Sequence, residues 1–194
     1  MSSQSSSEVR PIKNEVLTFK SAKAIFPKIY PLIFNLCTVY FLEYCAITCF
    51  SDRISIQVRR EMSIEDQSFQ VRQYYVILAN CYQVGVFVSR SSLQYYPVKR
   101  VSVLTMLQFM NFSFLFMNTI FLICPSLYVM CPLYVFIGLM GGASYVNVMH
   151  QILESEQLRQ SQKEAALVLT LIFNDIGVLL AAIFSLIMSQ TVIE

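Results

Sequence analysis

The chain has 194 residues and a formal net charge of +2; 56% of its residues are hydrophobic and only 13% are charged. An ordinary soluble domain carries about a quarter charged residues, so this composition excludes a typical soluble protein and indicates a membrane protein. The charges are dispersed, and no basic patch indicates a nucleic-acid partner. The lipid bilayer is the first partner that the composition predicts.

The first 28 residues divide into two parts. Residues 1–16 are polar and Ser-rich, so we expect a disordered tail, and they lack the short apolar core of a secretory signal peptide. Residues 17–28 place apolar residues among lysines. This pattern predicts either a short basic amphipathic helix on the cytosolic leaflet or a plain extension of the next helix.

Residues 29–194 form the predicted five-span membrane domain. A membrane-spanning helix needs about 20 mainly apolar residues, and the segments that fit are 29–50, 73–92, 101–123, 127–153 and 165–188. The second of these is the most polar. Residues 101–153 contain no Asp, Glu, Lys or Arg and would extend about 80 Å as one helix, so we place a break at Cys124-Pro125-Ser126. A solvated loop is expected over residues 51–72.

The distribution of basic residues predicts the orientation. With five spans, residues 1–28 share one side of the membrane with loops 89–100 and 154–164, and these segments hold ten Lys and Arg against four on the other side. The positive-inside rule therefore puts the N-terminus in the cytosol and the C-terminus in a lumen or outside. Arg90 then lies at the cytosolic face.

Glu43 is the one charged residue of the first span. An ionisable side chain inside a membrane is costly and by default faces the bundle interior or an aqueous cavity. Tyr40 lies three residues earlier on the same helix face, whereas Asn35 lies about 80° round the helix and would border the same cavity. Glu43 is therefore either a proton or cation site in a transport pathway or a structural carboxyl group hydrogen-bonded to a neighbouring helix.

The fourth span combines small and polar residues. Its small residues permit the close approach of another helix or of a ligand; they are Gly138, Gly141, Gly142 and Ala143. Asn147 and His150 follow on one helix face with Glu154. His150 is the only His of the chain and has no second ligand at metal spacing, which argues against a metal centre. These side chains either hydrogen-bond between helices or take part in proton coupling or substrate contact.

Polar residues also occur in the other spans. Asp175 lies near the middle of the fifth span, where a carboxylate is expensive, and Gln108, Asn111 and Asn118 form one stripe of the third. Such residues join membrane helices through hydrogen bonds, and their presence in every span suggests a hydrated cavity. There is no phosphate-binding glycine loop, HExxH or GxSxG, so we predict neither an enzyme nor a cofactor.

Three stretches resemble the battenin family, the Batten-disease protein and its fungal relatives: VYFLEY (39–44), YQVGVFVSRSSL (82–93) and GLMGGASYVNVMHQI (138–152). The resemblance covers residues 17–188 and corresponds only to the C-terminal half of a family member. It implies a lysosomal or vacuolar membrane protein, similar in fold to one lobe of a major facilitator-type transporter. It also implies roles in lumenal pH control, basic amino acid (arginine) transport and glycerophosphodiester clearance.

The resemblance assigns roles to individual residues. Glu43 falls on the family's Glu, and Asn147 and His150 fall on its polar pair. The family's Asp falls on Asn174, so Asp175 is one place late and about 100° away from the expected helix face. Arg90 falls on the Arg of the Ser-Arg-Ser-Ser stretch; together with Ser91 and Ser92 it is either a cytosolic gate or a plain positive-inside anchor.

One lobe supplies only one wall of a transporter cavity, because alternating access moves one half against the other. We therefore expect the chain to pair with a separately encoded lobe or with a second copy, to be a truncated copy, or to have lost transport. The predicted function is solute transport linked to lumenal pH, with a small-molecule substrate. The alternative is a membrane scaffold that recruits partners at its cytosolic face.

Overall fold

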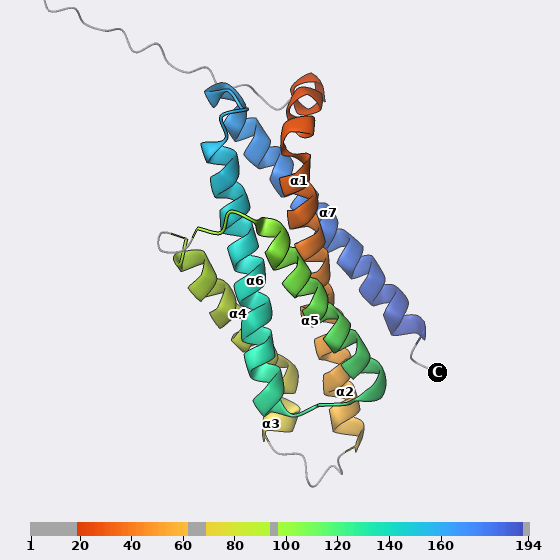
Figure 1. Ribbon diagram of the computed structural model, residues 1–194. Coiled ribbons are helices and arrows are strands. Elements are labelled where there is room, and N and C mark those ends of the chain that lie inside the picture. The colour runs from red at the N-terminus through yellow and green to blue at the C-terminus, as the bar shows by residue number, and fades with distance from the viewer. Residues whose placement is uncertain (1–18, 62–68, 94–96, 192–194) are drawn as a thin grey trace, which may run out of the picture.

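The computed structural model describes residues 19–61, 69–93 and 97–191, and every element in these ranges is a helix (Figure 1). The tail expected over residues 1–16 lies outside the described residues. Four stretches of helix are long and apolar enough to cross a membrane, namely Ser21–Arg60, Val101–Phe121, Leu127–Glu154 and Gln160–Gln190. The chain is therefore an all-helical, multi-pass membrane protein.

The predicted second span corresponds to α4 (Tyr74–Ser91), which is not among those four stretches. Asn80 and Gln83 lower the hydropathy of α4, and both side chains are exposed. The count of five spans is right only if α4 also crosses the membrane. The likeness to a facilitator lobe and the orientation of the two termini depend on the same condition, so all three stay predictions.

The first helical stretch is longer than the sequence predicted. α1 (Phe19–Tyr44), the π-helix η1 (Cys45–Phe50) and α2 (Ser51–Glu61) follow one another without a break. The described part of segment 17–28 is thus the first turns of α1, which is the helix extension left open above. Residues 51–61 are helical where a loop was expected. Asp52 in the first turn of α2 and Arg59 and Arg60 in its last turn have the signs that stabilise the ends of a helix.

The predicted break between the third and fourth spans is confirmed. α5 (Val101–Phe121) ends at Leu122, whose φ of 44° is left-handed, and α6 (Leu127–Glu154) begins five residues later. The Asn118 side-chain oxygen accepts a hydrogen bond from the Cys124 backbone N–H at 2.7 Å. Asn118 therefore belongs to the turn that reverses the chain.

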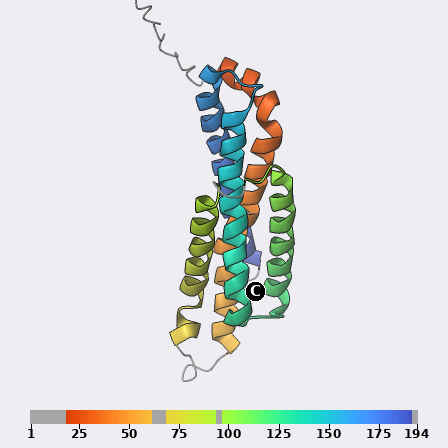
Figure 2. The ribbon, with the colours of Figure 1, turned by 60° about the vertical axis from the view of Figure 1, so that its left-hand side comes forward.

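Close glycine contacts hold α4 against α6, as the small residues of the fourth span predicted. A Cβ atom on Gly138 would lie 2.2 Å from the Tyr82 carbonyl oxygen, and one on Gly85 would lie 2.1 Å from the Val135 carbonyl oxygen. Because both obstacles are backbone atoms, only glycine fits at either position. α4 and α5 flank α6 on opposite sides in both views (Figures 1 and 2).

The last helix, α7 (Gln160–Thr191), packs along α1. A Cβ atom on Gly177 would lie 2.4 Å from the Cys37 carbonyl oxygen, so this crossing also depends on a glycine. Among the described residues, α7 does not approach α4. α4 packs mainly on α6 and α7 mainly on α1, so α4 and α7 are joined through α6, α1 and η1 rather than directly.

The π-helix η1 begins two residues after Glu43 and is held in place from α6. The Tyr134 hydroxyl donates to the Ala46 carbonyl at 3.1 Å, and the Ser51 hydroxyl donates to the Tyr134 oxygen at 2.7 Å. Tyr134 is fully buried. Single π turns inside α-helices occur frequently at functional sites, and here the turn directly follows the buried carboxyl group of α1.

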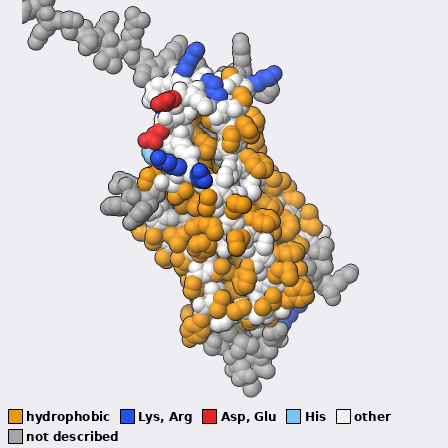
Figure 3. Space-filling model, viewed as in Figure 1, with side chains coloured by type: hydrophobic (Ala, Val, Ile, Leu, Met, Phe, Trp, Pro, Cys, Tyr) orange, Lys and Arg blue, Asp and Glu red, His pale blue; other side chains and the backbone are white. Residues whose placement is uncertain are grey.

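The surface matches a membrane environment. Large apolar side chains are exposed along α5 and α7, for example Met106, Phe121, Leu179 and Leu186. Over most of the face in Figure 3 the side chains are hydrophobic, and most charged ones gather toward the end where α1, α6 and α7 meet. The apolar surface is thus presented to lipid and the charged end to water.

Candidate functional site

Glu43 occupies the centre of the helix bundle. Its side chain is only 1% exposed, and its carboxyl group lies against Gly141 of α6, where a Cβ atom would come within 2.0 Å of Oε1. The Tyr82 hydroxyl of α4 lies close to it and interacts with its charge. Three helices therefore enclose this carboxyl group. The predicted interior position of Glu43 is confirmed, and its phenol partner comes from α4 rather than from Tyr40.

Tyr40 contacts a different charged group. Its hydroxyl accepts a hydrogen bond from Arg90 Nη2 at 3.4 Å, and its ring lies 6.3 Å from that of Tyr145 in α6. The Arg90 guanidinium carbon lies 4.9 Å from the centre of the Tyr145 ring, in a cation–π contact. Arg90 thus reaches from the last turn of α4 to α1 and α6.

Glu43 and Arg90 are close enough for their charges to interact, but they form no ion pair within 4.0 Å. Among the described residues, Glu43 Oε2 has no hydrogen-bond partner although it is buried. Burial disfavours the charged form of a carboxyl group, and a nearby cation favours it. Burial and the nearby cation therefore act on the Glu43 carboxyl group in opposite directions.

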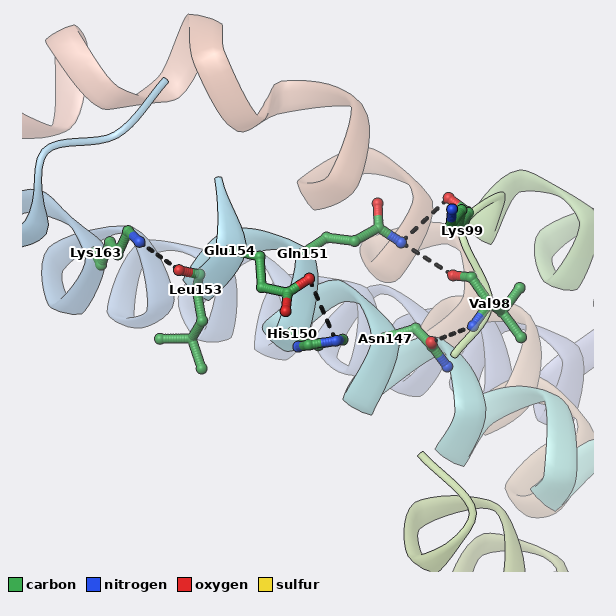
Figure 4. Close-up of polar contacts among 8 residues, drawn as sticks. All are labelled: Val98, Lys99, Asn147, His150, Gln151, Leu153, Glu154 and Lys163. Carbon is green, nitrogen blue, oxygen red and sulfur yellow. Dashed lines mark hydrogen bonds and ion pairs between the residues drawn. The ribbon is translucent and has the colours of Figure 1, made fainter. Parts of the chain in front are cut away.

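Asn147 holds the α4–α5 loop (Figure 4). Its side-chain oxygen accepts from the Val98 backbone N–H at 2.6 Å, and its amide donates to the Ala143 carbonyl at 2.8 Å. Gln151, one turn on, donates to the carbonyls of Val98 and Lys99 at 3.1 and 3.2 Å. The polar atoms of the Asn147 side chain are therefore engaged in clamping the loop, and they do not point toward Glu43.

We expect Asn147→Leu to loosen this loop with little change in the rest of the fold. Two hydrogen bonds of a buried amide are lost, at about 1 kcal/mol each. Hydrogen exchange measured by mass spectrometry should show faster exchange of the Val98 amide, roughly tenfold or more. Asn80→Leu is the matched control, because Asn80 bonds only to the Val76 carbonyl of its own helix. Unchanged exchange at Val98 in Asn147→Leu would contradict the clamp.

His150 lies on the outer side of the same helix end. Its Nε2 is 3.4 Å from the Glu154 carboxylate, and the two side chains are 34% and 70% exposed. Figure 4 shows this pair beside the clamp, with Lys163 of α7 reaching the Leu153 carbonyl. The structure therefore does not bring His150 to Glu43, although both belong to the predicted pathway.

Asn35 faces α5. Its amide donates to the Pro31 carbonyl at 2.7 Å, and its oxygen accepts from the Thr105 hydroxyl at 2.9 Å. With Thr38 and Ser102 these two residues line the polar side of a groove of about 670 Å³ between α1 and α5. Asn35 therefore borders a separate groove, and the prediction that it would border the same cavity as Glu43 is wrong, because its position round the helix turns it toward α5.

Two neighbouring polar residues of α7, Asn174 and Asp175, differ in burial. Asn174 is buried, and its Oδ1 has no hydrogen-bond partner among the described residues. Asp175 is exposed, and its charge interacts with Tyr44 of α1. The 100° offset anticipated from the resemblance thus places Asn174 inside and Asp175 on the exposed side of α7. Asp175 does not contact Glu43.

The serines next to Arg90 differ in their contacts. The hydroxyls of Ser91 and Ser92 donate to the carbonyls of Phe87 and Ser89 in their own helix, at 2.9 and 2.8 Å. Ser89, which the sequence did not single out, is buried and donates to the Gly138 carbonyl of α6 at 3.4 Å. Of the predicted group Arg90, Ser91 and Ser92, only Arg90 contacts other helices.

The polar stripe of α5 is buried, as expected for residues that join helices. Gln108, Asn111 and Asn118 are all less than a tenth exposed, and each keeps one buried polar atom without a hydrogen-bond partner among the described residues. Within those same residues, no group of His, Cys, Asp and Glu side chains could hold a metal ion. The strongest candidate for chemistry is therefore the group formed by Glu43, Tyr82, Tyr40, Arg90 and Tyr145.

The sequence alone did not identify Tyr82 and Tyr145. The chain contains eleven tyrosines, and an amphipathic phenol near a membrane boundary has an ordinary explanation. A weak signal was available, since Tyr82 lies three residues before Gly85 and Tyr145 lies three after Gly142. A large side chain on the same helix face as a close-packing glycine lies at the contact between the two helices.

Comparisons with known proteins agree with the earlier resemblance. The chain matches the family described as CLN3 protein over residues 1–194. It is 34% identical over 157 residues to Battenin of Dictyostelium discoideum, covering 81% of this chain and 36% of that protein. It is 32% identical to Protein BTN1 of Debaryomyces hansenii, covering 91% of this chain and 42% of that protein. It is 30% identical to Battenin of Canis lupus familiaris, covering 92% of this chain and 39% of that protein. The chain thus spans about two-fifths of the length of these relatives. No solved structure matches it significantly.

Proposed function

The chain belongs to the CLN3 protein family, and from this premise we propose that it is a transporter-like protein of a lysosomal or vacuolar membrane. It moves a small solute in a proton-linked way and so takes part in the control of lumenal pH. The proposed solute is a basic amino acid such as arginine, or a glycerophosphodiester.

One observation carries this proposal, namely the carboxyl group of Glu43. It is buried among three helices of a membrane protein, and one of its oxygens has no hydrogen-bond partner among the described residues. Most buried polar groups in proteins have a hydrogen-bond partner, so an unpartnered carboxyl oxygen calls for an explanation. Carboxyl groups inside membrane domains mark proton and ion pathways by default.

Exposed charges around Tyr44 of α1 support a second wall of the pathway. Arg90 of α4 and Asp175 of α7 are both exposed, and both interact with Tyr44. Charged groups at membrane depth need a polar surrounding. Since the relatives are more than twice as long as the matched region, we propose that another helical lobe, or a second copy of the chain, covers these charges. The solute would then pass between the two walls.

Transport is favoured over catalysis by the positions of three residues. An intramembrane enzyme would need Glu43, Asp175 and His150 to converge on one point. His150 pairs with Glu154, and Asp175 lies on the exposed face of α7. We therefore assign Glu43 a role in proton coupling, without a catalytic reaction.

The test is uptake into proteoliposomes that contain the protein purified from its native membrane, with any copurifying lobe retained. Radiolabelled arginine and glycerophosphoethanolamine are offered with and without an imposed pH gradient. We expect the gradient to increase uptake of at least one solute several-fold over protein-free vesicles. Uptake of both at the protein-free rate, whatever the gradient, would refute the proposal.

A scaffold at the cytosolic face is the second candidate. It is favoured by the exposed basic residues Lys23, Lys99, Arg100 and Arg159. A protein that only recruits partners would keep its membrane location and its binding of partners when Glu43 is replaced, and it would show no solute flux.

A further inference from the structure

We propose that Cys81 of α4 and Cys131 of α6 are a redox pair, a site of reversible disulfide formation that joins the two helices covalently when a small disulfide molecule oxidises it. The proposal goes beyond the transport function and does not depend on it. All six cysteines of the chain are free thiols, and these two interact across the contact between two helices.

The contact between α4 and α6 fixes the register of the two cysteines. Both helices begin at the same end of the bundle and run in the same direction (Figure 1). Cys81 lies four residues before Gly85, and Cys131 lies four residues before Val135, which Gly85 faces. Residues four apart share one face of an α-helix. Both thiols therefore lie one turn from the glycine contact, on the helix faces that meet.

The close approach of the helices brings the two thiols within bonding reach. A Cβ atom on Gly85 would lie 2.1 Å from the Val135 carbonyl oxygen, so the two backbones are in contact. A disulfide spans Cα atoms about 4.4–6.8 Å apart, whereas the axes of packed helices ordinarily lie about 8–10 Å apart. Backbone contact shortens the second distance toward the first. The Cys81 and Cys131 thiols are accordingly close enough to interact directly.

An oxidant can reach this pair from outside the bundle. Both cysteines are half-buried rather than enclosed. Cys131 lies three residues, or about 4.5 Å along the helix, from Tyr128, whose side chain is 90% exposed in the first turn of α6. An exposed tyrosine at the end of a membrane helix is typical of the interface with water. We therefore expect Cys131 to react first.

The reaction is thiol–disulfide exchange, and its oxidant is a small disulfide such as glutathione disulfide. The Cys131 thiolate attacks one sulfur of the oxidant, which forms a mixed disulfide and releases one small thiolate. The Cys81 thiolate then attacks the Cys131 sulfur, and the second small thiolate leaves. The two cysteines together lose two electrons and two protons, and the two released thiolates take up the protons. A reducing dithiol reverses both steps.

The disulfide secures the helix that the membrane holds least well. α4 is not among the stretches that are long and apolar enough to cross a membrane, and it makes most of its helix contacts with α6. At the start of α4 the Tyr74 hydroxyl donates to the Pro125 carbonyl at 2.7 Å, and the glycine contact follows one turn after Cys81. A covalent link between these two contacts prevents α4 and α6 from separating.

The other cysteines offer two competing pairs. Cys45 and Cys49 interact with each other, but both are at most 2% exposed and belong to one helical stretch. A link between them would join no second helix. Cys124 is half-buried in the connection before α6 and lies near Tyr74, as Cys131 does. A link that uses Cys124 is therefore the alternative that the experiment has to separate.

The experiment treats the purified full chain, reduced and then freed of reductant in a neutral detergent, with one equivalent of dithiodipyridine, a small disulfide. The remaining thiols are blocked with N-ethylmaleimide. Trypsin then releases residues 73–90, which contain Cys81 alone, and residues 101–159, which contain Cys124 and Cys131. We expect mass spectrometry to find these two peptides joined, and dithiothreitol to separate them.

Variants assign the link to its two cysteines. The joined peptides should be absent in Cys131→Ala, and they should form in native yield in Cys124→Ala, the matched control from the same tryptic peptide. In the native protein, oxidation should slow hydrogen exchange of residues 73–90 roughly tenfold or more. This difference should vanish in Cys131→Ala. A monodisperse elution profile shows that each variant is folded.

Three results would overturn the proposal. The first is blocked Cys81 and Cys131 thiols with no joined peptides in the native protein. The second is a link that persists in Cys131→Ala or is lost in Cys124→Ala, because Cys124 would then be the partner of Cys81. The third is equal hydrogen exchange in the oxidised and reduced proteins, because the link would then not hold α4. None of these measurements involves a solute or a pH gradient, so failure here leaves the transport function standing.

Discussion

Glu43→Gln is expected to abolish gradient-driven uptake, with a fall of roughly tenfold or more, because glutamine keeps the size and hydrogen-bonding capacity of the side chain but cannot exchange a proton. The carboxyl group lies against Gly141 and the Tyr82 hydroxyl, and the amide fits in the same space. The fold should therefore survive, and uptake should become independent of pH. Uptake with and without a pH gradient, together with a thermal melt of the same sample, measures both effects.

Glu156→Gln is the control for this prediction. Glu156 is exposed in the connection between α6 and α7, so the same chemical change there should leave uptake and its pH dependence as in the native protein. If Glu43→Gln keeps native gradient-driven uptake, Glu43 is a structural carboxyl group. The second reading derived from the sequence would then hold.

Gly138→Ala is expected to have the largest effect on stability. The new Cβ atom would lie 2.2 Å from the Tyr82 carbonyl oxygen and 2.9 Å from the Val86 nitrogen, so α4 and α6 must move apart. Overpacking of this kind costs about 1–3 kcal/mol or more, which exceeds the gain of about 1 kcal/mol in helix propensity from Gly to Ala. A thermal melt in detergent should show a lower transition or no folded protein.

Gly141→Ala is the matched comparison, one turn along the same helix. There the Cβ atom would meet the side-chain oxygens of Glu43, at 2.0 and 2.3 Å, rather than backbone. The end of a side chain can move, so stability should fall less than in Gly138→Ala. For the same loss of stability, Gly141→Ala should lower gradient-driven uptake more than Gly138→Ala does. Equal melting temperatures of the two variants would contradict the close contact of α4 and α6.

Much of the site could be predicted from the sequence because placing a polar or charged side chain in the membrane costs free energy. An ionisable side chain that faces lipid is costly, so the carboxyl group of the first span was expected in the interior, and Glu43 is buried. Gly138 belongs to a stripe of small residues, and helix contact is the ordinary use of such a stripe. The offset of Asp175 from the interior face followed from the resemblance, which aligns the family's Asp with Asn174, together with the helix period. Asn174 is the buried member of the pair.

Other parts could not be predicted, for physical reasons. Asn147 looked like a cavity residue, but it bonds to the backbone of Val98, and any residue except proline offers the same backbone donor. Tyr82 and Tyr145 depend on how α4 and α6 are rotated against α1, which no local pattern encodes. The helix over residues 51–61 was missed because it is charged along its length, whereas spans are recognised by hydropathy.

The most direct test of proton-linked transport is the internal pH of proteoliposomes, followed with a trapped dye after the solute is added at equal pH on both sides. If solute movement is coupled to protons through Glu43, the addition of arginine or glycerophosphoethanolamine should shift the internal pH in native vesicles and leave it constant in Glu43→Gln vesicles. A constant internal pH in native vesicles that nevertheless take up the solute would contradict proton coupling, and the same shift in both would contradict the role of Glu43.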